Sequence, residues 1–490
     1  MTEDNLKHKA ATGIIWTAIQ KYSTMIVGFI SSIILARLLM PEDYGAIGML
    51  AIFMSLAEVF TDAGFDSALI QKKNPSATDY STVFYFNIGM SVILYAVLFF
   101  SAPAIATFYR MPILCMVLRV QGVVLFINAL NIIQRNQIRK NLRFKKLSKV
   151  TITTSIISLI VTVVMAYKGC GVWALVAQNI VAAFVPCVFF WLTTEWHPTC
   201  EYSWKSFKEL FSFGSFMFLT HLLTTFSQRI TSLLVGRWYD SATMGYYSKA
   251  STTQKYATLS ISGVMIQTTY PLYASVQDNK ERLINMVKRI TSTLAYFTVP
   301  MLSLLILVAK PLFVLLYSDR WLTCVPYFQI LCIGGMAGCL QSVNQQTIAA
   351  VGKSKVFFIW TVVKQSVGIA LQVVGLIFWG MWGLLVGKVM ASWFSYFVNI
   401  ALVSKYVGYK YYHQLKDLSP VLIVSGVAFV VAYFGTNAFN LGMYPQGIVK
   451  VIFFFVVYFG WSIVFKPEAY KYTLSILDTF KKNRKKGVIV

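Results

Sequence analysis

Residues 171–193 read GVWALVAQNIVAAFVPCVFFWLT and contain no charged side chain. An α-helix needs about 20 apolar residues to cross the ~30 Å hydrocarbon core of a bilayer, so this stretch has the length of one transmembrane span. Similar stretches follow one another along the chain, with only short polar segments between them. The composition agrees, because 57% of the residues are hydrophobic and 12% are charged, whereas soluble domains carry about 25% charged residues. These features predict an all-α membrane protein.

The apolar stretches predict about fourteen transmembrane helices. We place them at residues 13–39, 45–70, 81–107, 112–134, 150–168, 171–193, 210–236, 243–271, 290–317, 326–350, 356–378, 382–404, 419–437 and 447–465. Basic residues gather in alternate connections, above all in a loop expected at residues 135–149 and in the tail at 481–486. This pattern follows the positive-inside rule. It predicts that both termini are cytoplasmic.

The first and seventh spans resemble each other at a constant offset of two hundred residues. The aligned pairs are Lys21 with His221, Ser32 with Ser232, Arg37 with Arg237 and Gly45 with Gly245. Six spans separate the two copies, so both have the same orientation in the membrane. Repeats of this kind are typical of alternating-access transporters. We therefore expect two six-helix lobes, at residues 1–209 and 210–404, followed by a helix pair and a basic cytoplasmic tail at residues 405–490.

Polar residues follow one face of both repeated spans. The candidate substrate-binding residues are Lys21 in the first span, His221, Gln228 and Arg229 in the seventh, and Lys255 in the eighth. A charged side chain that faces lipid is costly, so we expect the two polar faces to line a shared hydrated cavity. Hydrogen bonds between helices explain the Ser and Thr residues of these faces equally well, but not the cations. An excess of cations favours an anionic substrate.

The second span carries the acidic exception. Glu58, Asp62 and Asp66 are spaced four residues apart, so they lie on one face of a helix. A structural ion pair, for example between Asp62 and Lys21, is one interpretation. The other is an ion-coupling site that links transport to a gradient of protons or Na+.

The sequence contains no pattern that indicates catalysis. Four histidines are scattered, and neither a metal-ligand cluster nor a Gly-rich phosphate loop appears. We therefore predict that the chain is not an enzyme and holds no metal or cofactor, apart from a coupling proton or Na+. The positive-inside placement of the basic residues argues against nucleic acid as a partner. These residues favour contact with the anionic headgroups of membrane lipids instead.

Five motifs resemble a known family. In chain order they are ARLLMPEDYG at residues 36–45, TDAGFDSALI at 61–70, RKNLRFK at 139–145, GVWALV at 171–176 and GYYSKA at 245–250. This order is similar to that of bacterial polysaccharide flippases in the multidrug/oligosaccharidyl-lipid/polysaccharide exporter superfamily. The colanic-acid and teichuronic-acid exporter branch is the most similar, and the resemblance extends over nearly the whole chain.

The resemblance implies a flippase of the bacterial cytoplasmic (inner) membrane. Such a protein moves an oligosaccharide linked to undecaprenyl pyrophosphate from the inner to the outer leaflet during surface polysaccharide biosynthesis. Lipid-linked oligosaccharide and membrane lipids are then the expected partners, together with other membrane proteins of polysaccharide assembly. A drug/cation antiporter of the same superfamily is the first alternative, although such a protein needs acids around its substrate. A membrane scaffold that recruits polysaccharide enzymes is the second.

Overall fold

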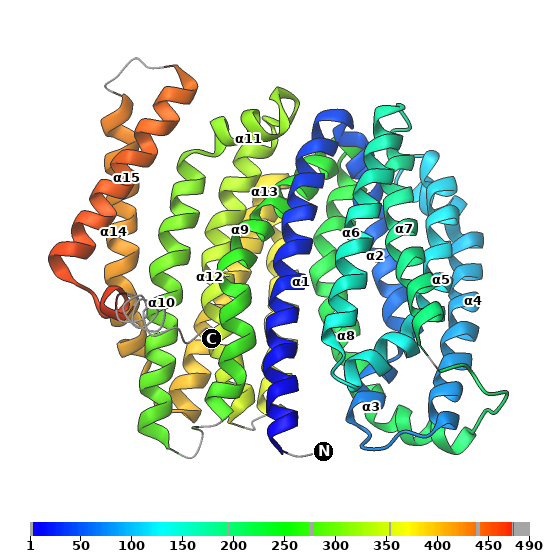
Figure 1. Ribbon diagram of the computed structural model, residues 1–490. Coiled ribbons are helices and arrows are strands. Elements are labelled where there is room, and N and C mark those ends of the chain that lie inside the picture. The colour runs from blue at the N-terminus through cyan, green and yellow to red at the C-terminus, as the bar shows by residue number, and fades with distance from the viewer. Residues whose placement is uncertain are drawn as a thin grey trace. The chain divides into compact units, whose positions relative to one another are not determined.

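The computed structural model describes residues 3–194, 196–274, 276, 279–351, 354–437, 442–472 and 474 (Figure 1). Within these ranges every regular element is a helix, and no strand is present. The predicted all-α membrane fold is confirmed, because twelve of the described helices are long and apolar enough to cross a membrane. The basic tail at residues 481–486 lies outside the described residues.

The number of spans stays a prediction, for two reasons that concern individual helices. Helix α13 (Ser354–Tyr406) consists of two legs, because its backbone is non-helical at Trp379 and Gly380. Helix α9 (Ser241–Ala274) has the length of a span, yet it is not among the twelve apolar helices.

The chain divides into two compact units, at residues 1–248 and 249–490, and the division falls within α9. The helices of the first unit are α1 (Glu3–Leu38), α2 (Pro41–Asp62), α3 (Phe65–Gln71), α4 (Ala77–Phe108), α5 (Ile113–Lys140), α6 (Phe144–Tyr167), α7 (Val172–Thr193), α8 (Trp204–Trp238) and the start of α9. The seventh predicted span, which is α8, is therefore grouped with the N-terminal helices. The predicted repeat lobes at residues 1–209 and 210–404 stay predictions.

Helix α2 is central to the packing of the first unit. It contacts α4, α5, α7 and α8, whereas α1 packs mainly against α6. At its N-terminus α2 meets the beginning of α9 at very short range. A Cβ atom built on Gly45 would lie 1.8 Å from the carbonyl oxygen of Ser241, and one built on Gly245 would lie 1.9 Å from that of Pro41. Both glycines are therefore required by a close approach of backbone to backbone.

The second predicted span is interrupted where α2 ends and α3 begins. Ala63 and Gly64 both have left-handed backbones, with φ values of 46° and 80°. Gly64 also faces the carbonyl oxygen of Gly214 in α8, and a Cβ atom at Gly64 would lie 2.1 Å from it. The conformation and the close contact both require glycine at this position. The acidic residues Asp62 and Asp66 consequently flank a break rather than lie on a continuous helix.

One expectation about the connections is wrong. Residues 135–149 were expected to form a basic loop, but α5 extends to Lys140 and α6 begins at Phe144. Only the three residues between these helices are non-helical. Arg135 and Arg139 therefore project from the last turns of α5, and their positions are fixed by the helix.

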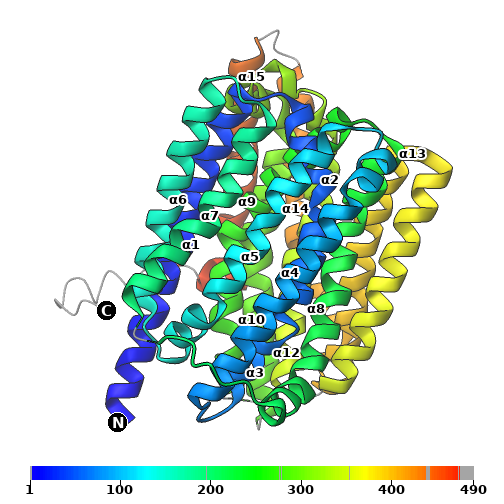
Figure 2. The same ribbon diagram turned by 90° about the vertical axis from the view of Figure 1, so that its right-hand side faces the viewer.

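The second unit contains the rest of α9, α10 (Lys280–Leu307), α11 (Ala309–Tyr317), the short 3₁₀ helix η1 (Asp319–Trp321), α12 (Cys324–Ala350), α13, α14 (Tyr411–Asn437) and α15 (Met443–Phe465). Helix α12 packs between α10 and α13, and α14 packs against α10 and α15. The two legs of α13 run side by side (Figure 2), because Gly375 and Gly383 allow their backbones to touch. The buried core of this unit includes Val287, Val343 and Val403.

Candidate substrate-binding site

Two pockets adjoin the break between α2 and α3, both within the first unit. The α5-side pocket has a volume of about 420 Å³ and is lined by Glu58, Thr61, Asp62, Asp66, Leu125, Asn128, Asn131, Ile132, Arg135 and Arg139. The α8-side pocket has a volume of about 390 Å³ and is lined by Ser55, Glu58, Val59, Asp62, Gly64, Asp66, Ser67, Phe218, His221, Thr225, Gln228 and Arg229. The three predicted ion-coupling acids line both pockets.

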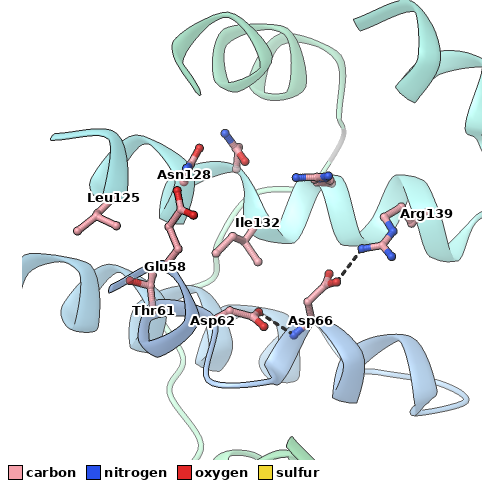
Figure 3. A pocket seen from close by; sticks show the side chains of 10 residues that line it. Glu58, Thr61, Asp62, Asp66, Leu125, Asn128, Ile132 and Arg139 are labelled. Carbon is pink, nitrogen blue, oxygen red and sulfur yellow. Dashed lines mark hydrogen bonds and ion pairs between the residues drawn. The ribbon is translucent and has the colours of Figure 1, made fainter. Parts of the chain in front are cut away.

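Asp66 is held by α5 across the α5-side pocket (Figure 3). Its Oδ2 atom forms an ion pair with Nη1 of Arg139 at 2.7 Å. Its Oδ1 atom accepts a hydrogen bond from Nδ2 of Asn136 at 2.8 Å. The same amide donates to the backbone oxygen of Asp66 at 2.9 Å. The negative charge of Asp66 is thus compensated within the protein, and the contacts fix the start of α3 against α5.

Asp62 has a different environment. Its Oδ1 atom accepts a hydrogen bond from the backbone N–H of Asp66 at 3.1 Å, so the side chain caps the first turn of α3. This turn has no helical partners for its N–H groups, and an acidic side chain is a favourable substitute. Asp62 lines the α8-side pocket together with His221. A carboxylate and an imidazole therefore share one small space.

Arg135 is the second arginine of the α5-side pocket. It lies on α5 one helical turn before Arg139, and its side chain is exposed in the pocket. Within the described part of the chain it forms no ion pair, in contrast to Arg139. A guanidinium group has planar donors that match the oxygens of phosphate or carboxylate. Asn128 and Asn131, which line the same pocket, add further hydrogen-bonding groups.

The α8-side pocket collects three of the five predicted substrate-binding residues. His221, Gln228 and Arg229 lie on one face of α8 and line the pocket opposite Glu58 and Asp62. This arrangement follows from helical geometry, because residues spaced by seven or eight positions lie on one face. The hydrogen-bond donors of α8 thus lie across the pocket from the acids of α2.

The other two predicted substrate-binding residues lie elsewhere. Lys21 is half-buried on α1 and lines neither pocket. Lys255 is an exposed residue of α9 in the second unit. Among the residues for which the structure gives a position, no group of three or more His, Cys, Asp or Glu side chains is arranged to hold a metal ion.

Four polar residues that α5 contributes to the α5-side pocket were not predicted as site residues: Asn128, Asn131, Arg135 and Arg139. Their spacing contains the necessary signal, since steps of three, four and four residues place them on one helical face. The predicted span ended at residue 134, and the two arginines were assigned to a loop. The two arginines lie on a polar end of α5 that extends beyond the apolar stretch, so the hydropathy pattern did not include them.

Solved structures show the class of fold. The structure of the lipid II flippase MurJ in an inward closed conformation has a TM-score of 0.75 and 16% identity to this chain, and the match covers 92% of this chain and 98% of MurJ. An inward-facing multidrug resistance transporter of the MATE family has a TM-score of 0.62 and 15% identity, covering 81% of this chain and 98% of the transporter. Chains this different in sequence share the fold alone. The class is therefore a polytopic membrane protein that shares its fold with MurJ and with this MATE transporter.

Sequence comparison shows the family. A family model described as polysaccharide biosynthesis protein matches residues 34–326, which is more than half of the chain. The teichuronic acid biosynthesis protein TuaB of Bacillus subtilis is 24% identical over 351 residues, covering 71% of this chain and 73% of TuaB. The chain belongs to this family of polysaccharide biosynthesis proteins. The family resemblance predicted from the five motifs is confirmed.

Proposed function

We propose that this protein is a flippase for an anionic, lipid-linked oligosaccharide. The substrate class is an oligosaccharide on undecaprenyl pyrophosphate, moved by alternating access from the inner to the outer leaflet of the bacterial cytoplasmic membrane. Both termini are then cytoplasmic, as the distribution of basic residues predicts. Membership of a polysaccharide biosynthesis family and similarity to TuaB support the substrate class.

One observation carries the proposal: Arg135 and Arg229, which form no direct ion pair among the described residues, line two pockets at a broken helix. Discontinuous helices form the binding sites of many transporters, because a break leaves backbone groups and charged side chains near a cavity. Arg135 on one side and Arg229 on the other can each bind phosphate oxygens through two donors. The pyrophosphate is the charged group that all substrates of this class share.

The acids around the break suggest how an ion could control binding. When ionised, Glu58, Asp62 and Asp66 carry three negative charges, which oppose the three positive charges of Arg135, Arg139 and Arg229. A proton or Na+ on one carboxylate leaves the pockets with a net positive charge. Binding of an anionic headgroup is then more favourable. Loading of the ion and loading of the substrate are coupled in this scheme.

The acids also support the alternative function, a drug/cation antiporter. All three line both pockets, and a MATE transporter has a similar fold. The two functions predict opposite ligands, since an antiporter binds an organic cation at the acids and a flippase binds a phosphate at the arginines. Lys21 and Lys255 lie outside these pockets, and we propose that they contact the substrate elsewhere along its path.

The test substitutes each of the two arginines separately and measures protein abundance together with transport. Arg135→Gln and Arg229→Gln should each slow transbilayer movement of an undecaprenyl pyrophosphate oligosaccharide in proteoliposomes by about tenfold or more, because each removes a charge-assisted contact. Arg143→Gln is the matched control, since Arg143 is an exposed arginine beyond the end of α5.

Normal transport by both pocket variants would overturn the anionic-headgroup site. Binding of a cationic dye that depends on Glu58 and Asp62, without any binding of the lipid-linked substrate, would establish the antiporter instead.

A further inference from the structure

The second unit contains a basic cavity that is separate from the proposed transport site. It has a volume of about 470 Å³ and lies between the first turns of α10 and the residues that follow α15. Its lining residues are Asn285, Lys288, Arg289, Ser292, Thr293, Glu468, Ala469, Lys471 and Tyr472. Asn285, Lys288, Arg289 and Ser292 are spaced by three, one and three residues, so they form one face of α10.

The charges in this cavity are unequally compensated. Nζ of Lys288 lies 3.6 Å from Oδ1 of Asp417 and 3.3 Å from Oε2 of Glu468, so Lys288 has two acidic partners. Arg289 and Lys471 have no acidic partner within the described ranges. The five charged groups sum to +1, because three cations face two carboxylates. That sum matches the single negative charge of a phosphodiester.

Arg289 is oriented by an aromatic ring. Its guanidinium carbon lies 3.3 Å from the centre of the Tyr472 ring, so the flat face of the guanidinium is covered. The N–H donors of a stacked guanidinium lie in its plane and stay available at the edge. The ring therefore holds the donors of Arg289 in a fixed direction beside Lys471 and the hydroxyl of Ser292.

The surroundings of the cavity indicate an amphiphilic ligand. Helix α15 ends at Phe465, and its last residues Ile463, Val464 and Phe465 have exposed fractions of 59%, 73% and 70%. Glu468 and Lys471 follow within six residues. Exposed apolar side chains at the end of a membrane helix contact acyl chains, and basic residues beyond them lie at the depth of the headgroups.

We propose that this cavity binds the phosphate group of an anionic membrane lipid, whose acyl chains lie along the exposed end of α15. Arg289 and Lys471 bind the phosphate oxygens, and Ser292 donates a hydrogen bond. Lys288 stays paired with Asp417 and Glu468 and holds the segment after α15 against α10. The bound lipid then links α15 to α10 through a charge that the protein itself does not supply. This site is independent of the proposed transport function.

Native mass spectrometry of the full-length protein tests the proposal. The protein is equilibrated with phosphatidylglycerol, with zwitterionic phosphatidylcholine, or with inorganic phosphate alone. We expect selective retention of phosphatidylglycerol and about tenfold weaker retention in the Arg289→Gln/Lys471→Gln double variant, because two charge-assisted contacts are lost. The control is Lys410→Gln/Lys416→Gln, which removes the same charge from exposed lysines near the start of α14.

The outcomes separate the sources of the phosphate. Equal retention of phosphatidylglycerol by the double variant and the unmodified protein would overturn the site. Binding of inorganic phosphate without retention of phosphatidylglycerol would overturn the lipid and assign a soluble phosphate. If the double variant does not fold, Lys471→Gln alone decides, since this side chain is exposed and its loss should leave the fold intact.

Discussion

Helices α2 and α9 begin alike and continue differently. At their N-termini, Gly45 faces the backbone of Ser241 and Gly245 faces the backbone of Pro41, so two pairs of residues offset by two hundred make reciprocal contacts. Helix α2 then ends at Asp62 in a left-handed break, whereas α9 continues as one helix to Ala274.

The difference extends to the chemistry of the two helices. Two hundred residues after Glu58, Asp62 and Asp66, the sequence has Thr258, Ser262 and Ile266. The contact at the helix start therefore occurs at both positions, whereas of these two helices, as the structure describes them, only α2 has the acids and the break. A contact that recurs at both positions is best explained by a structural role in the fold. A feature present in one copy is the better candidate for a specific role in transport.

The largest expected effect comes from filling the reciprocal contact. Gly45→Ala and Gly245→Ala should each destabilise the folded protein by about 3 kcal/mol, because a backbone oxygen cannot rotate away from the added methyl group. Both variants should lower the apparent melting temperature of the purified protein by similar amounts. Gly89→Ala is the control, since a Cβ atom there meets nothing within 4 Å. If all three variants melt alike, the reciprocal contact is absent.

A smaller effect, on coupling rather than folding, is expected from the acid that α9 lacks. Asp62→Asn should retain the cap on α3, because an amide oxygen also accepts the N–H of Asp66. The variant should lose the response of lipid flipping to an imposed proton or Na+ gradient, which we expect to be about tenfold in the unmodified protein. Asp43→Asn, at the other end of α2, should keep that response. A full response in Asp62→Asn would remove this residue from the coupling mechanism.

The smallest effect concerns how the two helices are capped. In α2 the backbone N–H of Met40 donates to Asp43, whereas in α9 the backbone N–H of Thr243 donates to Asp240 at 2.9 Å. Hydrogen bonds from the side chain and the backbone of Thr243 hold the pKa of Asp240 below its ordinary value of 3.8. Asp240→Ala should therefore cost about 1 kcal/mol at neutral pH.

The pH dependence of this cap has a definite sign. A carboxylate with a lowered pKa stabilises the fold fully above pH 3.8, and the contribution is lost as the pH falls through the lowered value. Thermal unfolding of Asp240→Ala and the unmodified protein should thus converge in acid. The thermal unfolding of Asp240→Asn, which caps without a charge, should not converge with that of Asp240→Ala in acid. A constant difference between the alanine variant and the unmodified protein at all pH values would contradict the assignment.

The sequence predicts the helices well because their signal is local. The stretch at 171–193 corresponds to α7, Val172–Thr193, within one residue. The site is harder to predict, because it depends on where helices end and on which of them are neighbours. Arg135 and Arg139 were misplaced by a span that ended at residue 134, although α5 continues to Lys140 as a polar helix end.

Neighbour relations carry no local signal at all. Lys21 and His221 occupy matching positions in the predicted repeat, yet only His221 lines a pocket at α2. Helix α8 packs against α2, while α1 packs against α6. The break after Asp62 was equally hidden, since Gly64 within an apolar stretch is compatible with an unbroken helix. The reason for a glycine at this position includes the approach of Gly214, which comes from a distant part of the chain.

The tight turn of α13 has a consequence for biosynthesis. Its two legs meet at Gly375 and Gly383, and the turn between them exposes Ile377, Phe378 and Trp379, with exposed fractions of 70% or more. No polar loop has to be carried across the bilayer between these legs. The translocon can therefore receive both legs as one hairpin, with the aromatic tip left at a membrane interface. A charged residue placed at this tip would act on membrane insertion before any transport step.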